Sequence, residues 1–269
     1  MPRFRVAATT DIEEGSLHQV QAGETAVLLV KTQGRIRALG AHCTHQHAPL
    51  ADGLLHGHRL VCPWHQAVFD VTTGDLLEPP ALDCLPTFPV EVEGDDVYVE
   101  LPEEPPFARA PDMATEDRGA DPRVVVIIGA GSAGIAAAQE VRRAGFRGGV
   151  VMVTEDEQAP YDRTHCSKGY LGGEAPAEWM PLKPAEFFTE AGIEKVVGRV
   201  SQVDLRDRTV TLPGGSSIQA DGLLLATGGE PRRLDVDGAD LDRVFTLRTW
   251  RDADAIIDAA DGARRAVVV

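Results

Sequence analysis

The sequence is poor in cysteine and in aromatic residues, and it has no long hydrophobic run. Only 4 of its 269 residues are cysteine, and 5% are aromatic. No stretch of about eighteen apolar residues occurs, so we expect no segment to span a membrane. The first residues, Met1 to Val6, have charges but no apolar run behind them, which argues against a secretory signal. We therefore expect a cytoplasmic protein.

Basic residues are also scarce relative to acidic ones. There are 26 Lys and Arg against 42 Asp and Glu, which gives a formal net charge of −16. A nucleic-acid partner is not expected, because its phosphates would be repelled. The charge serves either solubility or the attraction of a basic partner protein, and the sequence does not choose between them. The chain is long enough for two domains, each with its own core.

Residues 1–102 have the pattern of a small all-β domain. Apolar runs flank Thr32-Gln33-Gly34 as a hairpin. Alternating apolar and polar residues on both sides of Gly94-Asp95 predict a second hairpin. No helical period is sustained in this part of the chain.

The pattern changes twice after this domain. Residues 103–122 are rich in proline, Glu and Asp, which predicts a linker that its prolines extend in part. Beyond it, residues 124–128 and 150–153 are predicted to be buried strands on either side of a helix over residues 133–144. Residues 123–269 are therefore predicted to form an α/β, Rossmann-like domain.

Two short segments each pair one cysteine with one histidine. They are Cys43-Thr44-His45 and Cys62-Pro63-Trp64-His65, with sixteen residues between them. Each pair can lie on one tight loop, so the two loops can supply two thiolates to one iron and two imidazoles to the other. A zinc site with two cysteines and two histidines is the alternative. Zinc fingers, however, usually pair Cys with Cys and His with His.

The order of these residues closely resembles the Rieske ferredoxin family. Ala48-Pro49-Leu50, Phe69-Asp70 and Thr73-Gly74 add to the resemblance, which covers residues 4–100. It implies a [2Fe–2S] cluster of the low-potential type, since neither segment has a spare cysteine. The implied ligands are Cys43, His45, Cys62 and His65.

Other histidines crowd the same region. His42, His47, His56 and His58 do not stand at the family's ligand positions, so we expect surface or supporting roles for them. Cys84 lies beyond both segments and is predicted to be a small buried thiol.

A glycine-rich segment, Gly129-Ala130-Gly131-Ser132-Ala133-Gly134, stands between the first strand and the helix of the second part. Its glycines permit a tight turn and bring backbone N–H groups against a pyrophosphate at the positive end of the helix. Glu155 ends the next strand, 26 residues after Gly129, where a carboxylate can accept from ribose hydroxyls. Together these features predict a dinucleotide site.

Three further segments resemble the FAD-binding parts of ferredoxin reductases and apoptosis-inducing-factor-like flavoproteins. They are Tyr161-Asp162-Arg163, Ser167-Lys168-Gly169-Tyr170-Leu171 and Leu223-Leu224-Leu225-Ala226-Thr227-Gly228, the last followed by Pro231-Arg232. The resemblance implies FAD, with Arg163 by its diphosphate or ribityl chain and Lys168 near the isoalloxazine. For either residue, a solvated charge is the alternative. Val200, at the expected end of a strand, matches the position that meets the adenine.

The sequence departs from this family at Cys166, where leucine is usual. No second cysteine stands at the spacing of a disulfide reductase, so Cys166 is predicted to pack in the core. His165 could donate a proton, but a surface role is favoured. No residue is assigned a catalytic role.

A second departure lies at the end of the sequence. In the family, residues 266–269 would be the first strand of an inserted NAD(P)H domain with its own glycine motif. Because the sequence stops there, we expect a fragment of a longer protein that holds only the N-terminal portion of its FAD-binding domain. Such a chain should bind its cluster, bind flavin weakly or not at all, and be inert toward NADH and NADPH.

The two resemblances together imply a fused Rieske ferredoxin and FAD-dependent reductase. The intact protein would pass electrons from NAD(P)H to FAD, to the Rieske cluster and to an external acceptor, such as an oxygenase or reductase component. One alternative is an electron carrier whose flavin domain is a docking or sensor module. Another is a structural zinc protein.

Overall fold

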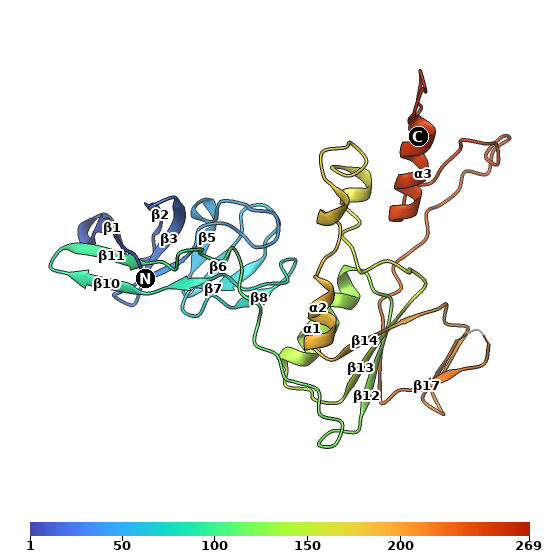
Figure 1. Ribbon diagram of the computed structural model, residues 1–269, viewed down its shortest axis with the longest axis horizontal. Helices are drawn as coiled ribbons and strands as arrows, with labels where there is room; N and C mark the ends of the chain where they lie inside the picture. Colours follow the sequence, from blue (N-terminus) through green and yellow to red (C-terminus); the bar gives the residue numbers. More distant parts are fainter. Residues whose placement is uncertain (213) are drawn as a thin grey trace. The chain divides into compact units, whose positions relative to one another are not determined.

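The computed structural model describes residues 1–212 and 214–269, and the chain divides into two compact units. The first unit comprises residues 1–112 and the second residues 113–269. Figure 1 shows the first unit in blue to green as strands with short connections, and the second in green to red with the long helices. The division falls inside the predicted linker, residues 103–122.

Three antiparallel sheets build the first unit. Their strand orders are β1-β11-β10, β2-β3-β4-β9 and β5-β6-β7-β8. The strands are Arg3–Ala8 (β1), Leu17–Ala22 (β2), Thr25–Thr32 (β3), Arg35–Gly40 (β4), Leu54–His56 (β5), Arg59–Val61 (β6), Val68–Asp70 (β7), Leu76–Glu78 (β8), Thr87–Phe88 (β9), Val90–Glu93 (β10) and Asp96–Glu100 (β11). Two 3-10 turns, Thr9–Asp11 and Leu50–Asp52, interrupt them. The predicted all-β domain is confirmed.

A two-residue turn fixes the register of the β3–β4 hairpin. Gln33 and Gly34 both have positive φ, at 54° and 70°, and Thr32 pairs with Arg35 across them. Positive φ at both central residues matches the twist of the flanking strands. This hairpin and the one between β10 and β11 confirm both sequence predictions.

The main core of the first unit lies around the two Cys/His segments. Leu50, Leu60 and Phe69 are fully buried in one cluster that also contains Cys43 and Cys62. The first segment starts just beyond β4 and the second just beyond β6. Strands and core together therefore position both loops.

A four-stranded parallel sheet forms the centre of the second unit, in the order β14-β13-β12-β18. Its strands are Val124–Ile128 (β12), Gly149–Thr154 (β13), Ile193–Val197 (β14) and Gly222–Leu225 (β18). The helices are Ser132–Arg143 (α1), Ala185–Glu190 (α2) and Trp250–Ala260 (α3). A small antiparallel sheet is formed by Gln202–Asp204 (β15), Thr209–Thr211 (β16) and Ser217–Gln219 (β17). The predicted β12-α1-β13 unit is confirmed, with ends that differ by one residue.

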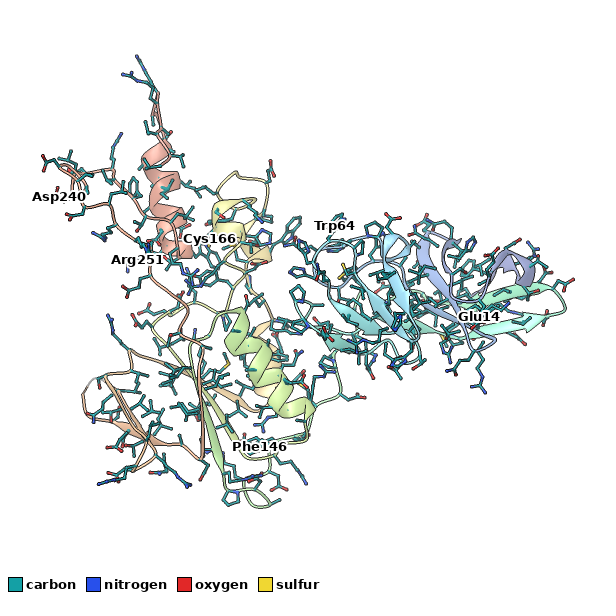
Figure 2. The ribbon with its side chains drawn as sticks, turned by 180° about the vertical axis from the view of Figure 1, so that it is seen from behind. Glu14, Trp64, Phe146, Cys166, Asp240 and Arg251 are labelled. Carbon is teal, nitrogen blue, oxygen red and sulfur yellow. The ribbon has the colours of Figure 1, made fainter. Side chains whose placement is uncertain are left out.

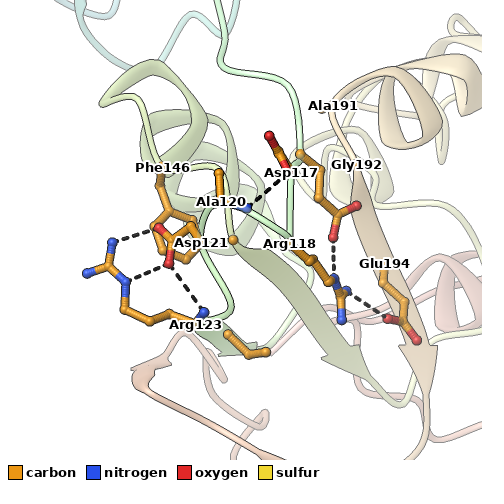
Figure 3. A network of polar contacts seen from close by, with 12 residues as sticks. Asp117, Arg118, Ala120, Asp121, Arg123, Phe146, Ala191, Gly192 and Glu194 are labelled. Atoms are coloured by element: carbon orange, nitrogen blue, oxygen red, sulfur yellow. Dashed lines mark hydrogen bonds and ion pairs between the residues drawn. The ribbon is translucent and has the colours of Figure 1, made fainter.

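Ion pairs hold the start of the second unit. Figure 3 shows Arg118 reaching Glu194 of β14, where the two charged groups are 3.8 Å apart. Arg118 also pairs with Glu116, and Arg123 pairs with Asp121 at 2.7 Å. This end of the predicted linker is thus bound to the sheet that follows it.

The structure corrects one prediction, because residues 266–269 do not form the expected strand. Val267, Val268 and Val269 are 87–98% exposed and belong to none of the sheets in the described part of the chain. An apolar run forms a stable strand only when a neighbouring strand pairs with its backbone, and these residues have no such neighbour among those described.

No helix among the described residues is both long and apolar enough to cross a membrane.

Candidate cofactor sites

The two Cys/His segments form loops of similar design. In the first loop the N–H of His47 donates to the carbonyl of Cys43 at 3.0 Å. In the second, the N–H of Gln66 donates to the carbonyl of Cys62 at 3.2 Å. His47 and Gln66 both have positive φ, 57° and 63°. Each cysteine and its histidine therefore lie on one closed turn, as the spacing predicts.

The structure brings like side chains of the two loops together. The Cys43 thiol is within hydrogen-bond reach of the Cys62 thiol, and both residues are buried. The rings of His45 and His65 lie edge to face, with centroids 4.9 Å apart and an interplanar angle of 82°. A Rieske cluster needs two thiolates on one iron and two imidazoles on the other, and this pairing fits it. Among the residues described, no group of three or more His, Cys, Asp or Glu side chains gathers around a single metal position.

The environment of the thiols also favours a bound cation. The pKa of the Cys43 thiol is raised to about 12, mainly by burial and in part by the neighbouring Cys62 side chain. Backbone N–H groups of His45 and Gln46 act in the opposite direction. Two adjacent thiolates in an apolar core need positive charge beside them, and iron supplies it.

The two sides of this site differ in exposure. Cys43 and Cys62 are 1% and 2% exposed, whereas His65 is exposed. Trp64 beside it is 57% exposed, with its ring 6.4 Å from that of His65 (Figure 2). The site is therefore more exposed on the side of His65 than on the side of the two cysteines.

Neighbouring residues have contacts of their own. The ring of His47 stacks on Phe107 with centroids 4.2 Å apart, and the Nε2 atom of His58 lies 3.8 Å from the carboxylate of Asp70. Cys84 is fully buried in the core, which confirms its prediction as a buried thiol.

In the second unit, the predicted glycine-rich segment turns from β12 into α1. A Cβ atom on Gly129, whose φ is 112°, would lie 2.1 Å from the carbonyl oxygen of Ala226. A Cβ on Gly134 would lie 2.0 Å from the carbonyl oxygen of Gly129. These two glycines are required by close backbone packing. A Cβ on Gly131, by contrast, would meet nothing within 4 Å, so this residue borders open space.

The start of α1 lies where the strand order of the sheet reverses. β12 has β13 on one side and β18 on the other, and such a reversal opens a crevice beyond the carboxyl ends of the strands. Ser132 and Ala133 are exposed there, and N–H groups of a first helical turn have no acceptor within the helix. The open cradle at Gly131 and these donors fit the diphosphate of a dinucleotide.

A pocket opens beside this cradle. Its wall is formed by Ala130, Gly131, Thr154, Asp156, Gln158, Ala159, Pro160, Tyr161 and Arg163. Glu155 follows β13 as predicted, but it is exposed and its carboxylate lies 3.5 Å from Arg199. Asp156, which sequence reasoning missed, is the carboxylate on the wall. The sequence did indicate an acidic residue here, because Asp156 also follows β13 closely. It did not indicate which of the two side chains faces the pocket, because side chains stop alternating once a strand has ended.

Arg163 and Lys168 are placed differently. Arg163 lines the pocket and its Nη1 donates to the carbonyl of Arg248 at 3.3 Å. Its guanidinium lies 5.4 Å from the ring centroid of Tyr161. Lys168 is exposed at the end of the 3-10 turn His165–Ser167. Arg163 therefore contacts the candidate site in this structure, and Lys168 does not line its pocket.

The segment after β18 closes the other side of the glycine turn. The backbone nitrogen of Thr227 would lie 3.1 Å from a Cβ on Gly129, and Gly228 follows with a φ of 70°. Val200 is not at the end of a strand as expected, because β14 already ends at Val197. It lies in the connection to β15 and packs against the apolar cluster that contains Val210.

Cys166 is 1% exposed and packs with Tyr161, Met180 and Ala253 (Figure 2). Burial raises the pKa of its thiol. A buried thiol of raised pKa is a poor nucleophile, which confirms the packing role predicted from the sequence.

Comparisons with known proteins agree with this geometry. Residues 3–89 match the Rieske [2Fe-2S] domain, and residues 123–269 match the pyridine nucleotide-disulphide oxidoreductase family. Because the second match covers more than half of the chain, this protein belongs to the pyridine nucleotide-disulphide oxidoreductase family, with a Rieske domain ahead of its flavin unit. The two matches imply a [2Fe–2S] cluster and FAD as cofactors.

Individual relatives cover one or both units. Apoptosis-inducing factor 3 of Mus musculus is 37% identical over 98% of this chain and 44% of its own length. The benzene 1,2-dioxygenase system ferredoxin–NAD(+) reductase subunit of Pseudomonas putida is 36% identical over 54% of this chain and 35% of its own. The crystal structure of the ferredoxin reductase for the CYP199A2 system from Rhodopseudomonas palustris has a TM-score of 0.50 at 32% identity, covering 52% of this chain and 34% of that one. The chain thus spans less than half the length of these relatives.

Proposed function

We propose that the complete protein is an FAD-dependent NAD(P)H oxidoreductase of the ferredoxin reductase type that passes electrons from FAD to its own Rieske cluster. One observation carries the proposal: a site with paired thiols and paired imidazoles stands on the same chain as a diphosphate cradle of the flavoprotein type. The family match supports a flavin reductase, and the Rieske match supports an electron carrier on the same chain.

On the first unit, the proposed ligands divide into a buried thiol pair and an outer imidazole pair. Cys43 and Cys62 would hold the inner iron, and His45 and His65 the outer one. The closed loops fix the backbone at both cysteines and so help to position the ligands. His65 is exposed and His45 half-buried, so the imidazole side then leaves a short path for an electron to an acceptor protein.

On the second unit, the proposed FAD site has three parts. The backbone from Gly129 to Gly134, with Ser132 and Ala133, would bind the diphosphate, and Arg163 would add a positive charge beside it. Glu155 is the proposed ribose ligand, with Asp156 as its neighbour on the pocket wall. Thr227, Gly228, Val200 and Lys168 are proposed to complete the contacts with the flavin and the adenine.

The two cofactors supply complementary chemistry when bound, because FAD accepts a hydride and releases single electrons, whereas a [2Fe–2S] cluster carries one electron at a time. The chain's part is to hold them, orient them and exclude water. The proposed acceptor is a redox protein such as an oxygenase or reductase component. The dioxygenase-system relative supports an acceptor of this kind.

The test is an anaerobic titration of the complete protein, loaded with both cofactors, with NADH and NADPH. We expect the flavin absorbance to bleach and the cluster to become reduced. A His65→Ala variant, deprived of its cluster, should still show flavin bleaching. If NADH and NADPH leave both cofactors oxidised, the reductase assignment is wrong, and the flavin unit is a docking or sensor module.

A further inference from the structure

The linker at residues 103–122 is not a uniform connection between the two units. The boundary between the compact units falls inside it, after Asp112. Linker residues before that boundary contact the first unit, and linker residues after it contact the second. These contacts decide how much chain is left to connect the two units.

Three contacts hold the linker on the first unit. The ring of Phe107 stacks on that of His47, with centroids 4.2 Å apart. The backbones of Arg109 and Cys84 form a bridge in which each N–H donates to the other's carbonyl, at 3.0 and 2.8 Å. The guanidinium of Arg109 also forms an ion pair with Asp75. We call this segment, from Phe107 to Arg109, the latch.

The latch is fixed to the interior of the first unit. Cys84, its backbone partner, is fully buried in the core cluster that also contains Cys43 and Cys62. A hydrogen-bonded bridge to a buried residue opens only when the surrounding core opens. The linker therefore leaves the first unit from Arg109, beside the core that carries the proposed cluster ligands.

The hold on the second unit begins at Ala114. The N–H of Ala114 donates to the carbonyl of Arg142 at 3.0 Å. Arg142, near the end of α1, is fully buried, and its guanidinium donates to the carbonyls of four residues at 2.6–2.8 Å. Asp117 adds an ion pair with Arg147 at 3.1 Å. The linker thus joins the second unit at a buried anchor.

The latch shortens the chain between the two units. Without it, the linker would start at Leu101 in the core of the first unit, and the 13 steps from there to Ala114 could span about 47 Å. With it, only the 5 steps from Arg109 to Ala114 remain, and these span about 18 Å at most. The effective concentration of one tethered group at another falls roughly as the −3/2 power of tether length, so the latch raises it about fourfold.

We propose that Phe107 and Arg109 are positioning residues for electron transfer, because they leave only residues 110–113 as the tether that keeps the cluster close to the flavin of its own chain. This inference rests on the proposed function and extends it. Neither residue contacts a proposed cofactor ligand directly in this role. They act by fixing where the tether begins.

The test compares two insertions of about ten Gly and Ser residues in the complete protein, loaded with both cofactors. Insertions of this kind in exposed segments cost little stability. One insertion follows Ala110 and lengthens the tether. The matched control lies between Glu103 and Glu104, which are both exposed and precede the latch, so the latch keeps the added residues out of the tether.

The measurement is the rate of cluster reduction after anaerobic mixing with the nicotinamide that reduces the flavin. We expect the insertion after Ala110 to slow this step about fivefold, and the control insertion to leave it unchanged. Flavin bleaching should be equally fast in both variants and in the native protein, because the tether takes no part in it.

A double variant and hydrogen exchange test the latch itself. Phe107→Ala combined with Arg109→Gln removes the ring contact and the ion pair, and it should slow cluster reduction up to about fourfold. Exchange supplies a readout that is independent of electron transfer. The N–H of Arg109 should exchange slowly in the native protein and faster in the double variant, whereas that of Ala114 should stay slow in both.

The outcomes separate this inference from the proposed function. If the native protein does not reduce its cluster, the proposed function is wrong and the role of the tether falls with it. If the native protein reduces its cluster and the two insertions slow that step equally, or neither slows it, only the positioning role is overturned. Rapid exchange of the Arg109 N–H in the native protein also overturns it, and this measurement decides even where an insertion variant does not fold.

Discussion

The rings of His45 and His65 meet edge to face at a centroid distance of 4.9 Å, although they come from two separate loops. Their cysteines, Cys43 and Cys62, meet behind them in the core. The four side chains are therefore sorted into a thiol pair and an imidazole pair. This sorting is what a cluster with two different irons requires.

The first prediction concerns cluster ligation. Changing His45 or His65 to cysteine should move the visible and electron-spin spectra from Rieske-like toward those of an all-cysteine cluster. The reduction potential should fall by an amount on the order of 100 mV, because imidazole ligands raise it. His47→Ala is the control, since His47 stacks on Phe107 instead. Loss of the cluster in that control would show that the ligands are misassigned.

The second prediction separates two glycines of the same motif. Gly134→Ala should lower the free energy of unfolding by about 1–3 kcal/mol, because its Cβ would lie 2.0 Å from a backbone oxygen. Gly131→Ala should leave stability unchanged, since its Cβ meets nothing, and should lower FAD affinity by about tenfold or more by filling the cradle. Urea unfolding and flavin titration measure the two effects. Equal loss of stability in both variants would contradict the open cradle at Gly131.

The third prediction asks which carboxylate binds the ribose. Glu155→Ala should weaken FAD binding by about 1.5–3 kcal/mol, the usual contribution of hydrogen bonds to a charged group. Asp156→Ala is the paired variant, because Asp156 lines the pocket while Glu155 lies 3.5 Å from Arg199. Flavin titration of both variants decides between the two residues. Full affinity in Glu155→Ala and a loss in Asp156→Ala would transfer the ribose role to Asp156.

The fourth prediction is a pH dependence of stability in the second unit. Burial raises the pKa of Tyr161 from 10.0 to about 12. A raised pKa in the folded state stabilises the fold fully below pH 10, and this contribution is lost as the pH rises toward 12. The loss should be about 2–3 kcal/mol at most. Chemical unfolding at a series of pH values measures it in the native protein and in Tyr161→Phe.

Tyr161→Phe isolates this contribution from other groups that titrate at high pH. The variant should be less stable than the native protein below pH 10, because the N–H of Trp250 loses its acceptor. The difference between the two proteins should shrink, and then reverse, as the pH rises. A constant difference up to pH 12 would show that the Tyr161 hydroxyl ionises normally.

Much of the fold follows from local pattern. Alternating residues around Gly94 and a turn at Gln33-Gly34 specify hairpins, because each strand has its partner next to it in the sequence. The β12-α1-β13 unit is equally local. Residues 266–269 show the limit of this reasoning, because an apolar run cannot reveal whether a neighbouring strand is there to pair with it.

The sites depend on contacts that are distant in sequence. The loop of each Cys/His pair could be predicted from its spacing, but the meeting of the two loops depends on how the strands β4 and β6 pack. Asp156 was missed because it lies just after a strand, where side-chain direction is no longer periodic. Val200 was expected at a strand end, but β14 already ends at Val197.

The central claim is that electrons from a nicotinamide reach the Rieske cluster through FAD on the same protein. The most direct test uses the complete protein with its cluster intact and its flavin removed, under anaerobic conditions. The account predicts that NADH or NADPH leaves the cluster oxidised in this preparation, and that addition of FAD leads to the electron-spin signal of the reduced cluster. Reduction of the cluster without FAD, or a cluster that stays oxidised after FAD is restored, would contradict it.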